Sequence, residues 1–140
     1  IGTSDALSIV TISNGLKVRK TLQEIMYARS IAIGKAGDVA VVNNSGQLFI
    51  INNQVIKETF TLKTGNAETF YTCCKYMDNG DLLVGTTTNE MYRLRKTNGK
   101  YRTIKRYTTG NLQQISSIAS DDQGNYSLVY IFSPGASQVV

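Results

Sequence analysis

The sequence predicts an all-β chain: a β-propeller fragment of about three four-stranded blades, beginning and ending inside a blade. The first observation is a glycine turn that recurs at spacings of 43 and 44 positions, as Gly37-Asp38, Gly80-Asp81 and Gly124-Asn125. The second is that four short apolar segments fall within each period. A repeat of about 40–50 residues with four strands is typical of a propeller blade.

Each recurring turn joins the first two strands of a predicted blade. The strands before the turns pair a small residue with an apolar one and cover residues 30–33, 73–76 and 117–120. The strands after the turns are mostly apolar and cover residues 39–42, 82–85 and 126–129. Short runs of this kind flanking a Gly-Asp or Gly-Asn turn indicate β-hairpins.

A third and a fourth strand follow the hairpin in each unit. The third strand is predicted at residues 7–10, 48–51 and 91–94. The fourth is more polar and is predicted at residues 16–20, 55–60 and 101–107. Valine, isoleucine, threonine and tyrosine crowd these runs, and the chain has a single proline, which agrees with strands on a pleated surface.

We expect all 140 residues to form part of one β-propeller domain, with a partial blade at 1–22, blades at 28–62 and 71–108, and a partial blade at 115–140. Ile1-Gly2-Thr3 aligns with Val84-Gly85-Thr86, inside a second strand, and the chain stops soon after the second strand of its last unit. A propeller ring has typically four to eight blades. We therefore expect the chain to be part of a larger ring, or one part of a ring made from several chains.

The residue pattern of the repeats resembles that of the two-component regulator propeller repeat. The resemblance rests on Gly80 to Leu94, on Ile1 to Leu7 and on Ile115 to Asn125, which follow its order of an acidic Gly-Asp or Gly-Asn turn, an apolar strand and Gly-Thr. The WD40 repeat is the second candidate, since it shares the blade layout and the period. Its Gly-His and Trp-Asp dipeptides do not occur here, because the chain has no histidine and no tryptophan.

The resemblance implies a non-catalytic module in the extracytoplasmic ligand-sensing region of a bacterial two-component-type regulator. The signal would be an oligosaccharide or another small molecule, and the location periplasmic or at the cell envelope, as part of a longer membrane-bound protein that forms a homodimer. The alternative is a protein–protein interaction scaffold, WD40-like or an envelope secretion accessory, with a cytoplasmic location as the second possibility. No apolar stretch of this segment is long enough to span a membrane, and nucleic acid is not an expected partner.

The composition disfavours an enzyme. Without histidine the chain lacks the commonest general base and metal ligand. We therefore expect no catalytic residues, no metal and no cofactor. The acidic pairs Asp121-Asp122 and Asp78 with Asp81 lie at the repeat turns, where we expect the carboxylates to bond their own backbone.

The two cysteines, Cys73 and Cys74, are adjacent on a predicted strand. Neighbouring side chains on a strand point to opposite faces, so we expect no disulfide between them and two small buried residues instead.

Positive charge is concentrated between residues 93 and 106, which contain seven Lys or Arg residues and no acid. Tyrosines interleave with these cations. The interpretation as a solvated blade rim and the interpretation as a surface for a ligand or partner both stay open. The candidate residues for such a surface are Arg93, Arg95, Tyr101, Arg102, Lys105 and Tyr107. The least repetitive stretches, 22–27, 63–70 and 108–114, are the candidate binding loops.

Overall fold

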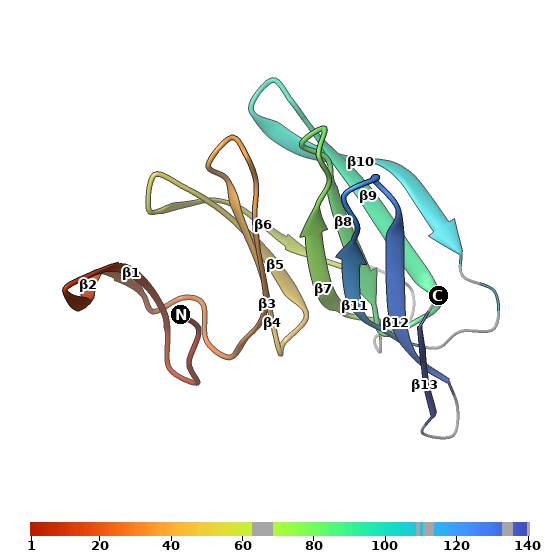
Figure 1. Ribbon diagram of the computed structural model, residues 1–140, viewed down its shortest axis with the longest axis horizontal. Coiled ribbons are helices and arrows are strands. Elements are labelled where there is room, and N and C mark those ends of the chain that lie inside the picture. Colours follow the sequence, from red (N-terminus) through yellow and green to blue (C-terminus); the bar gives the residue numbers. More distant parts are fainter. Residues whose placement is uncertain (63–68, 109, 111–113, 133–135, 140) are drawn as a thin grey trace.

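The computed structural model describes residues 1–62, 69–108, 110, 114–132 and 136–139. The regular elements of these described residues are all β-strands. The strands form four antiparallel sheets (Figure 1). They are β1 (Leu7–Ser13) and β2 (Gly15–Leu22); β3 (Ala28–Ile33), β4 (Val39–Asn43), β5 (Gln47–Asn52) and β6 (Val55–Thr61); β7 (Tyr71–Tyr76), β8 (Leu82–Thr86), β9 (Glu90–Thr97) and β10 (Lys100–Thr108); β11 (Gln114–Ser120), β12 (Tyr126–Phe132) and β13 (Ala136–Val139). The predicted all-β class is confirmed.

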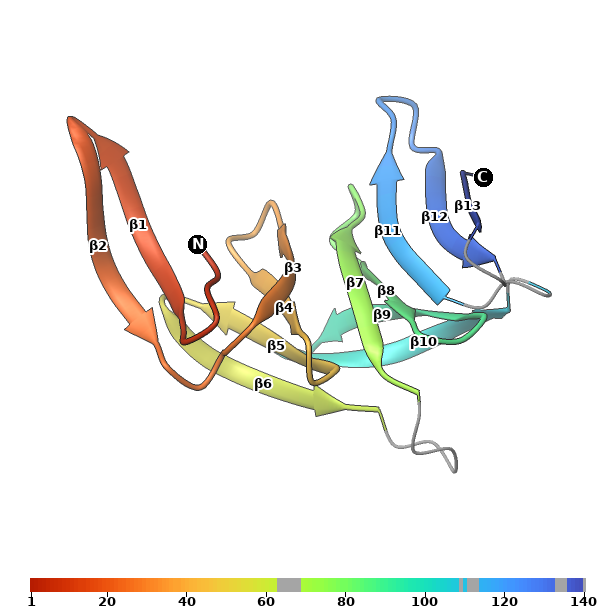
Figure 2. The same cartoon turned by 90° about the horizontal axis from the view of Figure 1, so that it is seen from below.

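The sheets follow one another in an arc from the N-terminal sheet to the C-terminal sheet (Figure 2). In both four-stranded sheets the strands are ordered as in the sequence, β3-β4-β5-β6 and β7-β8-β9-β10. The first strands of successive sheets, β3, β7 and β11, contact one another, so they form the inner side of the arc. This is the arrangement of blades in a propeller.

The three recurring glycine turns have the same geometry. Gly37, Gly80 and Gly124 all adopt positive φ, at 85°, 89° and 81°. In each turn one backbone N–H donates across the base of the loop, as from Gly34 to the carbonyl of Asp38 at 2.8 Å, and the glycine N–H closes the turn. A three-residue hairpin loop that ends in a left-handed residue requires this conformation, which glycine adopts without strain.

Beta-bulges also recur with the period of the repeat. The pairing of β3 with β4, of β7 with β8 and of β11 with β12 skips Arg29, Thr72 and Ser116 in turn, spacings of 43 and 44 positions. The bulge aims the Thr72 side chain at the next sheet, where its hydroxyl donates to the carbonyl of Ile115. Inner strands are therefore joined by side-chain hydrogen bonds as well as by apolar contacts.

Three apolar cores lie between successive sheets. The core between the two four-stranded sheets contains Val42, Leu48, Cys74, Leu82 and Val84 among others. The two remaining cores lie on the far faces of these sheets, toward β1 and β2 and toward β11 and β12. Cys73 and Cys74 are both free and buried, and they belong to different cores, as the alternation of strand side chains predicts.

One strand was not predicted from the sequence. β13 pairs with β12 in an antiparallel register from Phe132↔Ala136 to Val129↔Val139, so the last sheet has a third strand where the sequence indicated only two. The segment carries Ser137 and Gln138 and shows no apolar run, so the sequence pattern gave no signal for a strand there. No helix long and apolar enough to cross a membrane occurs among the described residues.

The sheet contact at Gly85 gives a first prediction. A Cβ atom on Gly85 would lie 2.7 Å from Sγ of Cys73 and 2.8 Å from Cγ2 of Ile115. We expect Gly85→Ala to lower the free energy of unfolding by about 1–3 kcal/mol, because overpacking forces neighbouring side chains and backbone apart. Urea unfolding measures the change. Ser120→Ala, at an exposed strand position, is the control, and an equal effect of both substitutions would contradict the close contact.

Candidate functional site

A buried carboxylate lies at the seam between the two four-stranded sheets. Asp38, in the turn between β3 and β4, accepts hydrogen bonds from Asn52 at 2.6 Å, from the Tyr101 hydroxyl at 2.6 Å and from Lys96 at 2.9 Å. Burial by itself raises the pKa of Asp38, but these three donors outweigh it and the pKa is lowered. Asp38 is therefore a paired anion that joins the two sheets.

Tyr101 crosses the same seam. Its hydroxyl lies 3.1 Å from that of Tyr76, and its backbone N–H donates to the carboxylate of Glu58 on β6, at 3.1 and 3.3 Å from the two oxygens. Burial raises the pKa of Tyr76 to about 12, and burial together with the Asp38 hydrogen bond raises that of Tyr101 further. Both phenols stay protonated at neutral pH and act as hydrogen-bond donors.

Asp81 is the equivalent carboxylate of the next sheet and has different partners. Arg95 binds its two oxygens at 2.9 Å each, and Arg93 binds one of them at 2.6 Å. The hydrogen bonds from Arg95 are the main reason that the pKa of Asp81 falls to about 2. The expectation that the turn carboxylates bond their own backbone is therefore wrong for Asp81. It holds for Asp121, which accepts from the backbone N–H of Gln123 and of Asn125, both at 2.9 Å.

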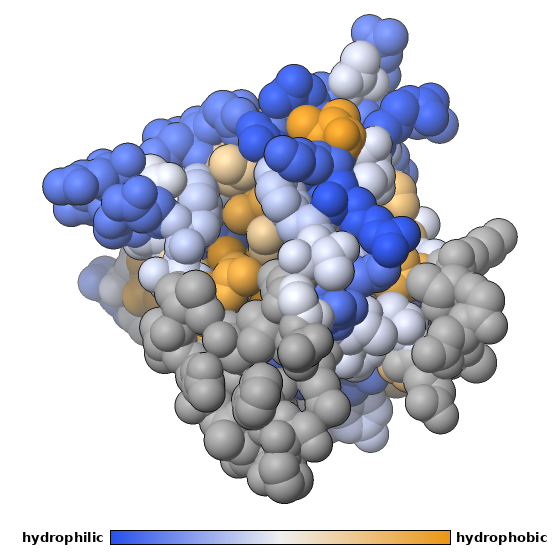
Figure 3. Space-filling model, turned by 90° about the vertical axis from the view of Figure 1, so that its right-hand side faces the viewer, coloured by the Kyte–Doolittle hydropathy of each residue, from blue (hydrophilic) through white to orange (hydrophobic). Residues whose placement is uncertain are grey.

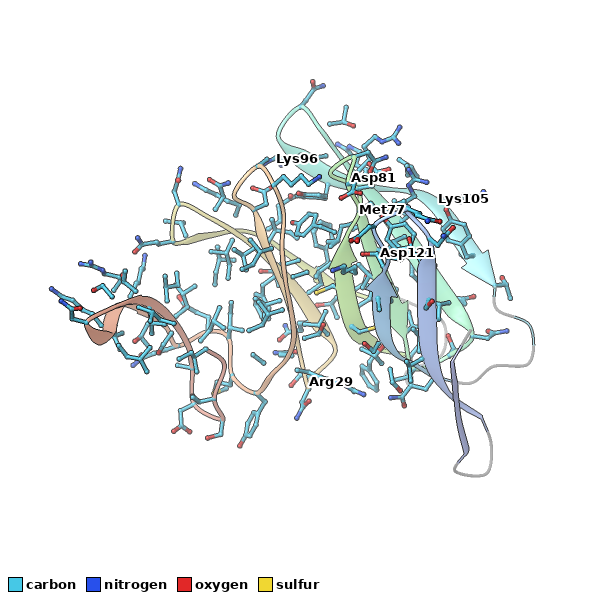
Figure 4. The ribbon with its side chains drawn as sticks, in the orientation of Figure 1. Arg29, Met77, Asp81, Lys96, Lys105 and Asp121 are labelled. Carbon is cyan, nitrogen blue, oxygen red and sulfur yellow. The ribbon has the colours of Figure 1, made fainter. Side chains whose placement is uncertain are left out.

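The six candidate residues of the basic segment have different surroundings, although a side-chain hydrogen bond brings Arg93 and Tyr107 together. Arg93 and Arg95 are bound to Asp81, and Tyr101 is buried against Asp38. The Lys105 ammonium lies 5.0 Å from the ring centre of Tyr107, while Arg102 is exposed. Figure 4 shows Lys96, Asp81 and Asp121 at the end of the sheets opposite to Arg29. On the side of the molecule that Figure 3 views, the described residues are mostly hydrophilic, with hydrophobic residues between them.

Two adjacent cavities open along the seam. The larger, of about 300 Å³, is lined by Asp38, Ile50, Asn52, Lys57, Glu58, Lys96, Gly99, Lys100 and Tyr101. The smaller, of about 200 Å³, is lined by Gly34, Lys35, Ala36, Asp38, Tyr76, Asp78, Asn79, Gly80 and Tyr101. Asp38 and Tyr101 line both, so the two form one interrupted trough, which we call the seam groove.

The seam groove contains two lysines without an ion pair in the described part of the chain. Lys96 is bound to Asp38, and Lys35 to Asp78 at 3.1 Å, whereas Lys57 and Lys100 have no acidic partner there. Lys57 is the residue that the pairing of β5 with β6 skips, because Ile51 pairs with Ile56 and Ile50 with Glu58. A β-bulge re-aims a side chain, and this one brings Lys57 to the groove wall.

The two cysteines are not activated as nucleophiles. Burial raises the pKa of the Cys74 thiol to about 12 and also raises that of Cys73, so neither is a thiolate at neutral pH. The described residues contain no group of three or more side chains suited to hold a metal ion. Two buried carboxylates, Asp38 at the groove and Asp81 in the next sheet, are already engaged by cations.

Sequence patterns did not single out several residues of the groove, among them Lys35, Asn52, Lys57, Glu58 and Tyr76. One signal was present for Asn52, since it stands 43 positions before Arg95, and each lies 14 positions after its turn aspartate. Of the candidate binding loops, residues 63–68, 109 and 111–113 lie outside the described residues.

Comparison with known proteins supports the fold. The chain is similar to Sqt1 of Saccharomyces cerevisiae, with a TM-score of 0.70 and 15% identity over 97% of this chain and 38% of that one. It is similar to a protein of unknown function from Bacteroides caccae, with a TM-score of 0.61 and 15% identity over 97% of this chain and 54% of that one. It is also similar to the WD40 β-propeller domain of Doa1, with a TM-score of 0.61 and 20% identity over 88% of this chain and 40% of that one.

The chain has a β-propeller fold. It spans between 38% and 54% of the length of these structures. No family model matches the sequence, and a search of curated proteins finds no similar sequence. The resemblance to the two-component regulator propeller repeat therefore gains no support from a family match, and the WD40 propeller, the second candidate, is among the structural neighbours.

The Asp81 cluster gives a pH prediction. The pKa of Asp81 is about 2 in the folded state, against 3.8 for the free group. The ionised carboxylate therefore stabilises the folded state fully above about pH 4, and this stabilisation is lost as the pH falls through 2. We expect this loss to be about 2 kcal/mol in the free energy of unfolding. Urea unfolding from pH 6 to 2 measures it. We expect Asp81→Asn to flatten the dependence of stability on pH in this range, and Asp5→Asn, in an exposed turn, to leave it unchanged as the control. Parallel pH profiles for wild type and Asp81→Asn would contradict the role of Asp81.

The tyrosine pair at the seam gives another prediction. Tyr101→Phe removes the donor that Asp38 receives from the neighbouring sheet, and we expect the free energy of unfolding to fall by about 1–3 kcal/mol because a buried acceptor loses a partner. Thermal and urea unfolding measure the loss. Tyr27→Phe, at an exposed position, is the matched control and changes stability by less than about 0.5 kcal/mol. Equal stability of both variants would mean that the seam hydrogen bond is replaced by water.

Proposed function

We propose that this chain is part of a non-catalytic propeller that binds a protein partner through the seam groove. The observation that carries the proposal is an open groove with a fixed floor. Asp38 and Tyr101 are held by hydrogen bonds from both sheets, while Lys57 and Lys100 are exposed at the wall. A site of this kind offers oriented donors and charge to a partner without a nucleophile or a general base.

Two further points support an interaction role. The exposed cations of the groove bear directly on partner choice, because charged groups at a surface steer association and set its specificity. Similarity in fold to the WD40 propeller domain of Doa1 is compatible with a scaffold, although the likeness carries the fold and not the partner.

A ligand sensor is the second candidate. The observation that favours it is the larger cavity, whose volume of about 300 Å³ is at the lower bound for small-molecule sites. In this case the occupant would be an oligosaccharide or another small molecule, and the protein would act in the periplasm as part of a two-component-type regulator.

Lysine cross-linking with mass spectrometry on the full-length protein, purified with its partners, tests the first proposal. We expect cross-links to one partner protein from Lys35, Lys57 and Lys100, and not from Lys17 and Lys20 on β2, which are exposed but distant along the arc. A parallel thermal-shift screen of mono- and oligosaccharides tests the sensor, because a ligand of the folded state raises the melting temperature. A rise with one sugar, without groove cross-links, would replace the scaffold by the sensor.

A further inference from the structure

We infer that the seam groove recognises an acidic peptide segment in which a carboxylate side chain lies close to an apolar one. This inference rests on the proposed function and names the chemistry of the partner. Its basis is the division of the groove into two unlike halves, one with available positive charge and one with a small, mostly apolar wall.

The charges that line the groove favour a negatively charged ligand. Four lysines and three acids line the two cavities, which leaves a net charge of +1. Asp38 is paired with Lys96 and Asp78 with Lys35, whereas Glu58 accepts a hydrogen bond from the backbone N–H of Tyr101 and keeps its negative charge. Lys57 and Lys100 together therefore leave one positive charge unbalanced beside Glu58. Lys57 and Lys100 are the two cations of the groove that lack an acidic partner among the described residues. A peptide carboxylate in the larger cavity supplies the missing anion.

The backbone directs these lysines to the groove. Lys57 occupies the β-bulge of β6, and Lys100 begins β10 directly after the Asn98-Gly99 turn, whose residues both have positive φ. Each lysine is therefore held at its base by a defined backbone feature while its ammonium stays exposed. An arrangement of this kind favours a flexible anionic side chain over a rigid ligand, because a lysine ammonium is a point charge on a mobile stem.

The smaller cavity fits an apolar side chain. Gly34, Ala36 and Gly80 contribute little or no side chain, and the ring of Tyr76 forms part of the wall. The Tyr76 hydroxyl is hydrogen-bonded to the Tyr101 hydroxyl, at 3.1 Å, so the polar end of the ring is already satisfied. A volume of about 200 Å³ exceeds what one aliphatic side chain occupies, and burial of such a side chain stabilises a complex by roughly 1.5–3 kcal/mol.

The two cavities meet at Asp38 and Tyr101, so one extended peptide spans both. Successive residues of an extended segment are about 3.3 Å apart, and because the cavities share two wall residues, we expect the carboxylate and the apolar side chain to stand only a few positions apart. The specific prediction is a motif with Asp or Glu within three positions of an aliphatic or aromatic residue.

Peptide display on the full-length protein tests the inference. A library of random 12-residue peptides is selected against the immobilised protein, and an enriched peptide is labelled with fluorescein for fluorescence polarisation. We expect enrichment of the acidic–apolar motif, and about tenfold or greater weakening of the peptide by Lys57→Glu combined with Lys100→Glu. The double variant Lys17→Glu and Lys20→Glu makes the same change in net charge away from the groove and is expected to change affinity less than about twofold.

Several other results of this experiment would overturn the acidic-peptide inference. Enriched peptides without acids, or equal binding to both double variants, would overturn it. A 12-nucleotide single-stranded DNA that displaces the peptide with equal affinity at 150 mM salt would also overturn it, in favour of a phosphate-bearing partner. If the wild type selects no peptide and shows no groove cross-links, the proposed function fails as well. If the double variant Lys57→Glu and Lys100→Glu still cross-links to a partner through the groove, only the acidic motif is rejected. Unchanged melting temperatures establish that the variants are folded.

Discussion

Burial of the two four-stranded sheets on both faces of their central strands is the constraint from which the other features follow. β4 and β8 are buried along almost their whole length, because apolar side chains on both of their faces enter a core shared with a neighbouring sheet. A strand in that position is a continuous apolar run rather than an alternating one. The same constraint places the adjacent thiols of Cys73 and Cys74 in two different cores and leaves no space for a side chain at Gly85.

The close approach of the sheets also buries two turn carboxylates. A buried carboxylate is costly unless it is paired, and both are paired with cations from the chain segment between Arg93 and Lys100. One of these ion pairs lies within a single sheet, and the other joins two sheets. Arg93 and Arg95 neutralise Asp81 within their own sheet, whereas Lys96 and Tyr101 reach Asp38 in the preceding one. The basic segment thus serves first to hold the turns and the seam.

The part of this segment that is not used in pairing gives the seam groove its available charge. Once Arg93, Arg95 and Lys96 are assigned to carboxylates, the exposed charge beside the seam comes from Lys100 and from Lys57 of the neighbouring sheet. The groove therefore combines residues of two blades. The shape of the groove therefore depends on the packing of the blades, because Tyr101 both lines it and joins the two sheets.

The sequence by itself determined most of the strands, the period and the turns, since these depend on local rules. Glycine at Gly37, Gly80 and Gly124 is required by positive φ, and apolar runs mark the strands whatever their neighbours are. It also determined that Cys73 and Cys74 point apart. Only the tertiary structure decided which cations are free, because Asp38 and Lys96 are 58 positions apart and meet across the seam. The bulge at Lys57 and the strand β13 were likewise decided by pairing between strands, and backbone pairing leaves little trace in the order of apolar and polar residues.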